Sequence, residues 1–346
     1  PMTYRKLVAT TFSTNFRDAA AIVEEPLPDP KPHEVIVRNA YAAVNATDVN
    51  IAAGRYEPGA RPPLDLGVEA VGHVVATGSE VRHLQAGDAV VTSAVGGGYR
   101  EYQVVRASTA MKIAEATPEA LSIVVSGLTA SIALNEVGEM HSGETVLVTA
   151  AAGGTGQYAV QLAKRAGNHV IGTCGTDEKA AFLESLGCDH PINYSEEDVA
   201  AVLKDNYPSG VNLIYESVGG ELFDTCVDAL ARYGRLLSIG FISEYVEGVA
   251  SVSQPRVYAK LLPKSASVRG FFLPHYAEHF NEHIERLMKL QKSGALHVAI
   301  DEKVFNGLGS VVDAVEYLHS GQSRGKVVVR FPEAADEDGR PTESAS

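Results

Sequence analysis

The stretch Val146-Leu-Val-Thr-Ala-Ala-Ala-Gly153-Gly154-Thr155-Gly156-Gln157 breaks a short apolar run into glycines, after which apolar residues recur at helical spacing through Lys164. The run over 145–149 predicts a buried strand that enters a helix through the glycines. The unpaired N–H groups and positive dipole end of such a helix can bind the pyrophosphate of a dinucleotide. On the Gly-x-Gly-x-x-Gly pattern the chain has Ala151, Gly153 and Gly156, so the first glycine is missing and the interpretation depends on its context.

Strands and helices alternate regularly after this loop. Strands are predicted at 169–172, 191–194, 212–215, 235–239 and 267–271, and helices at 178–186, 196–206 and 221–231. Such alternation is typical of a parallel sheet, and about six strands is the number found in a doubly wound Rossmann domain. We therefore predict an α/β fold with a doubly wound parallel-sheet domain.

The N-terminal part has a different pattern. Short β-branched runs between Gly, Pro and Asp turns predict a compact, mostly antiparallel β domain; they lie at 35–37, 72–75, 89–92 and 102–105. Residues 118–137 are helix-compatible and are expected to bridge into the second domain. We place the β domain at 1–122 and 295–346 and the Rossmann domain at 123–294.

The C-terminal part is expected to return to the β domain. A helix over 275–293 leaves the Rossmann sheet, and a helix near 310–320 precedes a strand over 326–330. From Glu333 onward the sequence is polar and turn-rich, which predicts a disordered tail.

Composition limits the class of protein. The 346 residues are 45% hydrophobic, enough for two buried cores, and the net charge of -14 argues against nucleic acid or an anionic membrane as principal partner. The three cysteines, Cys174, Cys188 and Cys226, lack any Cys-x-x-Cys pairing, which disfavours a disulfide framework and favours a cytoplasmic location. No export segment and no run of transmembrane length is expected.

Several motifs resemble the medium-chain dehydrogenase/reductase superfamily over nearly the whole chain. They are Asn45-Ala-Thr-Asp48 followed by Gly54, Gly67-Val-Glu-Ala-Val-Gly72, Ser126-Gly-Leu-Thr-Ala130 and Ala150-Ala-Ala-Gly-Gly-Thr-Gly156. The resemblance is to the zinc-free quinone oxidoreductase and enone reductase branch, and runs such as Tyr215-Glu-Ser-Val-Gly-Gly220 look like its prostaglandin reductase 3 type. It implies a GroES-like catalytic domain, an active site in the cleft beside the Rossmann domain, bound NADPH and a homodimer.

The chain lacks the residues that bind catalytic zinc in the superfamily's metal-dependent alcohol dehydrogenases. Where those enzymes carry Cys, His and Cys, this chain has Asn45, Val68 and Ser126. A valine cannot ligate and an amide is a poor ligand, so we expect no zinc there. Without a Lewis acid to stabilise an alkoxide, simple alcohol oxidation is disfavoured.

A histidine stripe offers a rival metal hypothesis. His275, His279 and His283 fall at i, i+4 and i+8, which is ligand-capable spacing on one helix face. The same helix carries Phe280, Ile284 and Leu287, and histidines on such a helix more often form a solvated or interdomain face. We assign no metal ligand.

The end of the second Rossmann strand indicates the choice of cofactor. NAD enzymes place a carboxylate there for the ribose hydroxyls, whereas 170–176 ends in small neutral residues. Asp177 and Glu178 come slightly late, and helix capping and first-turn charge explain them. Lys179 and Tyr194 match the superfamily residues that bind the 2′-phosphate, so the resemblance implies NADPH rather than NADH.

Reduction of an enone puts negative charge on a carbonyl oxygen, which a donor must stabilise. Our catalytic candidates are Asn45, at a former metal-ligand position, Tyr56, through its phenol, and Tyr245, on the loop that faces the cofactor in the family. The remaining predicted cofactor contacts follow from the resemblance: Thr129, Gly153, Gly154, Thr155, Gly156, Thr176, Ser217, Ile239, Gly240, Phe271, Leu273 and, where the family carries Asn, Ser323.

The sequence therefore predicts an NADPH-dependent oxidoreductase that reduces the C=C bond of α,β-unsaturated carbonyl compounds without zinc. An NADPH:quinone oxidoreductase and a non-catalytic NADPH-binding protein stay open as alternatives, because all three keep the glycine loop.

Overall fold

The computed structural model describes residues 2–252 and 254–333, which form two compact units. The first comprises Pro1–Val124, Asp301–Gln322 and Val327–Ser346, as far as these ranges are described, and the second comprises Val125–Ile300 and Ser323–Lys326. The predicted tail beyond Glu333 lies outside the described residues.

A six-stranded sheet forms the second unit, in the order β11-β10-β9-β12-β13-β14, and every pairing in it is parallel. The strands are β9 (Thr145–Val148), β10 (His169–Cys174), β11 (His190–Asn193), β12 (Val211–Glu216), β13 (Leu230–Ser238) and β14 (Ser267–Gly270). The chain starts at the sheet's centre and reverses direction after β11, which is the doubly wound arrangement that the sequence predicts.

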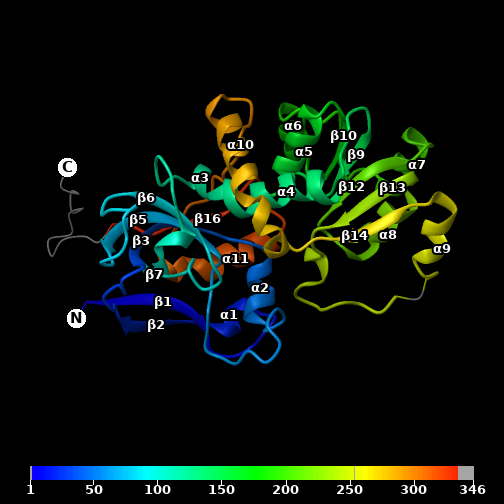
Figure 1. Cartoon of the computed structure of the whole chain (residues 1–346). Coiled ribbons are helices and arrows are strands. Elements are labelled where there is room, and N and C mark those ends of the chain that lie inside the picture. The colour runs from blue at the N-terminus through cyan, green and yellow to red at the C-terminus, as the bar shows by residue number, and fades with distance from the viewer. Residues whose placement is uncertain (1, 253, 334–346) are drawn as a thin grey trace. The chain divides into compact units, whose positions relative to one another are not determined.

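Helices cover both faces of this sheet. They are α5 (Gly156–Arg165), α6 (Asp177–Ser185), α7 (Val199–Asn206) and α8 (Gly220–Asp228). Residues of α7 and α8 share one buried cluster with Leu147, Ile171 and Ile214 of the strands. In Figure 1, α5 and α6 lie on the other side of the sheet from α8. The central strands β9 and β10 are largely buried on both faces and are mostly apolar, whereas the edge strands β11 and β14 are partly exposed and carry polar residues.

Two segments of the second unit differ from the sequence-based expectation. The helix predicted over 221–231 ends at Asp228, and Leu230 already pairs with Val211 as the first residue of β13. The helix predicted over 275–293 is broken: a 3-10 segment, η6 (Leu273–His279), with Pro274 in its first turn and non-helical angles at Tyr276, precedes α10 (Phe280–Lys292). Proline favours a helix start but Tyr276 interrupts the helix, so one continuous stripe cannot form.

The first unit is mostly antiparallel β structure, as expected from its short β-branched runs. A seven-stranded sheet contains β15-β16-β3-β5-β6-β8, with β7 paired to β3, and a smaller sheet has the order β2-β1-β4. The strands are β1 (Thr3–Ala9), β2 (Ala20–Pro26), β3 (Glu34–Ala43), β4 (Leu64–Asp65), β5 (Glu69–Thr77), β6 (Ala89–Ser93), β7 (Tyr102–Arg106), β8 (Ala110–Lys112), β15 (Phe305–Asn306) and β16 (Val328–Arg330). Val35, Val37, Val74 and Val90 pack in its core.

Three helices belong to this unit besides the start of the long connecting helix: α1 (Phe16–Ala19), α2 (Thr47–Ala52) and α11 (Val311–His319). The C-terminal segment returns to this unit because β16 pairs antiparallel with β3, with Val329 opposite Ala42.

The boundaries of the units differ from the predicted ones in three places. Residues 123 and 124 belong to the first unit. Residues 295–300 belong to the second unit, because Gln157 of α5 exchanges two hydrogen bonds with the Ala299 backbone, at 2.9 and 2.7 Å. The strip Ser323–Lys326 also belongs there, since Gly325 donates to Ala152 O at 2.8 Å.

The connecting helix spans Pro118–Val137 and contains α3 (Pro118–Ser122), α4 (Leu128–Ile132) and two wider π-type turns, η2 (Ile123–Gly127) and η3 (Ala133–Val137). The sequence analysis expects no run of transmembrane length, but this helix is long and apolar enough to span a bilayer by length and composition alone. Of its most apolar window, 67% is buried inside the protein, which is how core helices satisfy the same criterion.

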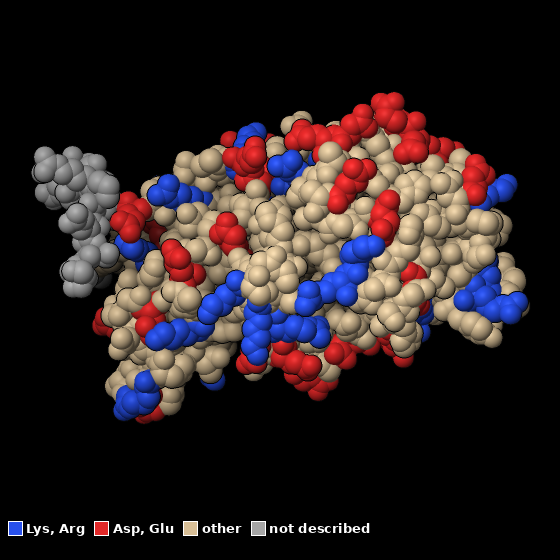
Figure 2. Space-filling view, turned by 90° about the horizontal axis from the view of Figure 1, so that it is seen from above, with Lys and Arg blue, Asp and Glu red and all other residues tan. Residues whose placement is uncertain are grey.

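Charged side chains of both signs occupy the surface. Figure 2 shows acidic and basic residues interspersed over the face seen from above, with basic side chains gathered into short bands. The chain's net charge of -14 therefore leaves room for local positively charged sites.

Candidate functional site

The loop between β9 and α5 needs its glycines for steric reasons. A Cβ on Gly156 would come within 2.3 Å of Ala150 O, and one on Gly153 within 3.2 Å of the same atom. Ala150 itself has a positive φ of 46°, which turns the chain sharply after the strand. The backbone N–H groups at the start of α5 are thereby left uncovered by side chains, as pyrophosphate binding requires.

The missing first glycine of the fingerprint has a structural counterpart. Ala151 is fully buried, and its methyl group lies where a Cβ on Gly172 of the neighbouring strand would come within 2.9 Å. A glycine on β10 thus makes room for the alanine on the loop. The close approach of strand and loop is kept, although the sequence pattern is incomplete.

The strip Ser323–Lys326 lies along the glycine loop. Gly153 and Gly325 form a parallel bridge, and Ser323, which precedes Gly325 by two residues, is largely buried. The Lys326 ammonium donates to the Ser126 hydroxyl at 2.8 Å, and its side chain lies 3.1 Å from a Cβ position on Gly154. The structure therefore brings Ser323 to the unit that holds Gly153 and Gly154, and adds Lys326, which sequence reasoning missed.

Lys326 had one signal in the sequence. It stands between Gly325 and the apolar run 327–329. In the structure its side chain is 3% exposed, which is unusual for a lysine unless a polar group holds its charge. Thr155 is also anchored from this side, since its hydroxyl donates to Ser126 O at 2.9 Å and lies 2.7 Å from the Tyr215 hydroxyl. Thr129 is half-buried in α4, within the connecting helix that also contains Ser126.

The end of β10 carries the residues predicted to bind a 2′-phosphate. Thr176 caps α6 by accepting from Lys179 N at 3.1 Å, so both sit in the first turn of a helix. The Tyr194 hydroxyl lies 2.8 Å from a Cβ position on Gly175, and the ring is 56% exposed. Thr176, Lys179 and Tyr194 thus surround one strand end, where the helix dipole and the lysine favour an anion.

Asp177 is held by a neighbouring strand. Its Oδ1 accepts from Asn193 Nδ2 at 2.9 Å, and the helix cap is Thr176 rather than Asp177. Arg324 approaches the same helix: its guanidinium lies 3.2 Å from Glu178 Oε1 and 5.0 Å from the centre of the Phe182 ring. Arg324 was not among the predicted residues.

Ser217 follows β12 and has an unused hydroxyl. Its N–H donates to Thr149 Oγ1 at 2.9 Å, but its Oγ is buried and, among the described residues, finds no hydrogen-bond partner. An orphaned buried hydroxyl at the carboxyl end of a parallel strand fits a bound ligand group. Glu216 holds this turn, accepting from Val218 N at 2.8 Å, and burial raises its pKa despite that bond.

Tyr245 packs against the loop after β13. It is 6% exposed, its hydroxyl accepts from Phe241 N at 3.3 Å, and the two rings meet edge to face at 4.7 Å. A Cβ on Gly240 would come within 2.8 Å of that hydroxyl, so Gly240 is required there. Tyr245 therefore supports the loop that continues from Ile239, and its catalytic role stays a prediction.

Phe271 and Leu273 follow the edge strand β14. Phe271 N donates to Ser238 O at 3.2 Å, and the Phe271 ring stacks on Tyr276 at 5.2 Å. Leu273 opens η6. Ile239, Gly240 and Phe271 accordingly lie at the carboxyl ends of neighbouring strands, with Ser217 and the glycine loop.

Asn45 is fixed by carboxylates in the first unit. Its Nδ2 donates to Glu69 Oε1 at 3.0 Å and reaches Ala43 O at 3.5 Å, and its backbone N–H donates to Asp48 Oδ2 at 3.0 Å. Since a carboxylate oxygen only accepts, the nitrogen end of the amide faces Glu69 and the Oδ1 faces elsewhere. An amide nitrogen carries two N–H donors, so the predicted role of Asn45 at a substrate carbonyl stays a prediction.

Tyr56 is held by two side chains of α2. Its phenol oxygen accepts from Thr47 Oγ1 at 2.5 Å and from Asn50 Nδ2 at 3.1 Å. The ring is 47% exposed, so a small molecule can reach it, and the catalytic role of Tyr56 stays a prediction.

Comparison with known proteins defines the family. Residues 31–115 match the alcohol dehydrogenase GroES-like domain and residues 154–298 the zinc-binding dehydrogenase domain. The chain is 49% identical to mouse prostaglandin reductase-3, covering 96% of this chain and 90% of that protein, and 43% identical to a probable quinone oxidoreductase of Leishmania amazonensis, covering 96% and 99%. The structure of Escherichia coli quinone oxidoreductase complexed with NADPH superposes with a TM-score of 0.82 at 30% identity, covering 94% and 99%.

The chain belongs to the medium-chain dehydrogenase/reductase superfamily. It is an oxidoreductase that uses a nicotinamide cofactor. The glycine loop, the orphaned Ser217 hydroxyl and the cationic strand end at Lys179 fit that cofactor. Asn45, Val68 and Ser126 do not fit a catalytic zinc, because together they offer one amide and one hydroxyl and no thiolate or imidazole.

Proposed function

We propose that the protein is an NADPH-dependent reductase of C=C bonds conjugated to a carbonyl group. The observation that carries this proposal is the set Asn45, Val68 and Ser126 at the positions of the zinc ligands. Oxidation of an alcohol needs a Lewis acid to stabilise the alkoxide, and these residues supply none. A conjugated C=C needs only a donor at the carbonyl oxygen.

The second unit supplies the cofactor site in this proposal. The α5 N-terminus with Gly153, Gly154, Thr155 and Gly156 binds the pyrophosphate, and Lys179 and Tyr194 bind the 2′-phosphate that distinguishes NADPH. The Ser217 hydroxyl and the backbone at Ile239 and Gly240 bind the nicotinamide end. NADPH, when bound, supplies the hydride.

The first unit supplies the carbonyl site. Tyr56 donates its phenol proton in a hydrogen bond to the substrate oxygen, while Thr47 and Asn50 hold the phenol oxygen from behind. The Asn45 side-chain amide is oriented by Glu69 and helps to position the substrate carbonyl. Hydride addition at the β-carbon gives an enolate, and in this proposal its α-carbon takes a proton from solvent. No ionised acid or base is therefore required, because the hydrogen bonds need only strengthen as charge develops on the substrate oxygen.

Product analysis tests the proposal. NADPH consumption is measured against alkenals, long-chain enones and quinones, and each product is identified by mass spectrometry and NMR. A saturated ketone with deuterium at the β-carbon from labelled NADPH supports the proposal. Hydroquinone or semiquinone with no enone turnover supports quinone reduction, which the quinone oxidoreductase relatives favour. Tight NADPH binding without any turnover means a non-catalytic protein.

We further propose a homodimer in a reducing cytoplasm. The three cysteines are free and buried in the described part of the chain, which suits a compartment without disulfide formation. The dimer rests on the resemblance to the superfamily. Light scattering after size exclusion tests it, since one chain has a mass of 36.7 kDa.

A further inference from the structure

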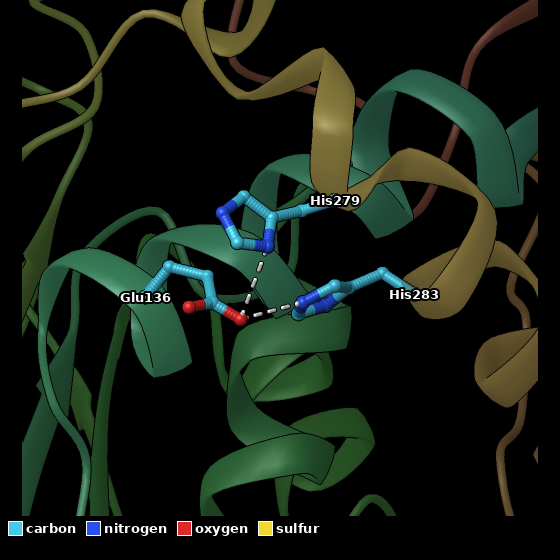
Figure 3. Close-up of side chains that lie close together, drawn as sticks. All are labelled: Glu136, His279 and His283. Carbon is cyan, nitrogen blue, oxygen red and sulfur yellow. Dashed lines mark hydrogen bonds and ion pairs between the residues drawn. The ribbon is translucent and has the colours of Figure 1, made fainter.

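Three metal-ligating side chains of the second unit meet outside the residues proposed for cofactor binding. Glu136 lies in η3, His279 ends η6, and His283 lies in the first turn of α10. Their ligand atoms all lie within 4.8 Å of one another, and Figure 3 shows both imidazoles directed at the Glu136 carboxylate.

We propose that Glu136, His279 and His283 form a binding site for a divalent transition-metal ion of the Zn²⁺ class. Two imidazoles and one carboxylate are a ligand set that zinc accepts, with water in the fourth position. The site uses none of Asn45, Val68 and Ser126 and goes beyond the proposed reductase activity. Only part of the predicted histidine stripe takes part, because the break at Tyr276 separates His275 from the other two.

The distances suit a tetrahedral ion. Ligands at zinc bond lengths in tetrahedral geometry stand about 3.3 Å apart. His283 Nε2 lies 3.1 Å from Glu136 Oε1, and His279 Nδ1 lies 3.6 Å from the same oxygen. These pairs are therefore already near the spacing of ligands around one ion, and small rotations of His279 and Glu136 bring all three into range.

Each imidazole also has an outer partner at its second nitrogen. His279 Nε2 faces Glu278 Oε1 at 3.4 Å, and His283 Nδ1 faces the Ser131 hydroxyl at 2.7 Å. Metal-binding histidines characteristically donate their other N–H to such a carboxylate or oxygen. For His279 this partner is in place, whereas His283 must first change tautomer, because Arg286 donates to its Nδ1 at 3.0 Å.

The cluster is open to solvent on one side. The side chains of Glu136 and His279 are 34% and 29% exposed, so an ion and its water ligand can enter from solvent. His283 is 1% exposed, so its imidazole is held at the buried side of the cluster.

The positive charge of Arg286 disfavours metal binding and limits the affinity of the cluster for the ion. Its Nη2 lies 3.0 Å from His283 Nδ1 and donates to Ser131 Oγ at 2.8 Å. In the metal-free protein Nδ1 accepts a hydrogen bond and Nε2–H donates to Glu136. With metal bound, the tautomer reverses and Nδ1–H donates to Ser131 Oγ. The nearby guanidinium charge repels the ion, so replacing Arg286 with a neutral residue should tighten binding.

Titration of the full-length, chelator-treated protein with Zn²⁺ and Co²⁺ alone tests the proposal. We expect one equivalent of Zn²⁺ by calorimetry and tetrahedral d–d absorption with Co²⁺. Glu136→Gln and His279→Gln should each weaken binding at least about tenfold, and Arg286→Gln should strengthen it about threefold. His275→Gln is the matched control, since His275 is an exposed histidine of η6 outside the cluster, and it should bind like the unmutated protein.

These variants keep the test independent of folding. Glu136 and His279 are partly exposed, whereas His283 is fully buried and is left unchanged. Zn²⁺ should also raise the melting temperature of the unmutated protein and of His275→Gln but not of Glu136→Gln, because the ion joins η3 to α10. Absence of a saturable site, equal binding by Glu136→Gln and His279→Gln, an equal loss in His275→Gln, or no gain in Arg286→Gln would overturn the proposal.

Discussion

The Glu69 carboxylate accepts a hydrogen bond from the Asn45 side-chain amide at 3.0 Å, and Glu69 is fully buried. This pair decides which end of the amide faces away from the carboxylate. At a position where zinc-dependent relatives carry a metal ligand, the chain therefore has an oriented side-chain amide. In the proposed mechanism Tyr56 is the donor to the substrate carbonyl.

The first prediction ranks these two residues. Tyr56→Phe removes a donor and should lower kcat by about 10²–10³-fold, the effect of losing one such hydrogen bond, with little change in NADPH affinity. Asn45→Ala should cost less, about tenfold, because only orientation is lost. Steady-state kinetics with one enone measures both. A larger loss in Asn45→Ala than in Tyr56→Phe would restore Asn45 as the donor.

The second prediction separates two lysines of the cofactor site. Lys179→Ala should raise the Kd for NADPH about tenfold to a hundredfold and leave NADH unchanged, since one charge-assisted bond to the 2′-phosphate contributes about 1.5–3 kcal/mol. Lys326→Met should weaken NADPH and NADH alike, because Lys326 lies beside Gly154 and Ser126 rather than at the phosphate-selective strand end. Fluorescence titration with both cofactors measures the difference. A selective effect of Lys326→Met would reverse these assignments.

Local sequence patterns predicted most of the fold, but they did not predict the contacts between segments that are far apart in the chain. The strand, glycine loop and helix at 145–165 follow from periodicity and sterics within one segment. The docking of Ser323–Lys326 on the glycine loop depends on a pairing between Gly153 and Gly325, which nothing in either segment encodes alone. The orientation of Asn45 likewise depends on Glu69. Because the Glu69 side chain is fully buried, a search for site residues would take it for a core residue. The cluster of Glu136 with His279 and His283 depends on packing between η3 and α10, which are far apart in the sequence.

The third prediction concerns the incomplete fingerprint. Gly172→Ala should destabilise the protein by about 1–3 kcal/mol, because the new methyl group overlaps that of Ala151. Combining it with Ala151→Gly should recover part of that loss, since the two methyl groups exchange places. Gly309→Ala, at an open position with no unusual φ, is the control. Urea denaturation is measured for the unmutated protein, both single variants, the double variant and Gly309→Ala, and additive losses in the double variant would refute the explanation.

The fourth prediction is a pH dependence of stability from His319. Burial lowers its pKa below the ordinary value of 6.5, although a hydrogen bond with the Ala46 backbone partly offsets this. The folded protein therefore favours the neutral ring. The contribution to stability is fully present above about pH 6.5, the pKa of the unfolded chain, and is lost as pH falls from there through the lower folded pKa. His319→Gln should flatten the acid limb of the unfolding free energy measured by denaturant titration. An unchanged slope below pH 6.5 would remove His319 as its cause.

The last prediction is that reductase activity does not depend on a metal, even if the Glu136 site binds one. The donors at Asn45, Val68 and Ser126 include no soft or imidazole ligand, so hydride transfer must rely on oriented hydrogen bonds. Treatment with a strong chelator should leave kcat and kcat/KM unchanged, and so should His279→Gln, which disables only the proposed surface site. Metal analysis of the chelated enzyme verifies that the ion is gone. Loss of activity on chelation in the unmutated enzyme, restored by Zn²⁺ and equally present in His279→Gln, would place a required ion at the Asn45 position and would favour alcohol oxidation over C=C reduction.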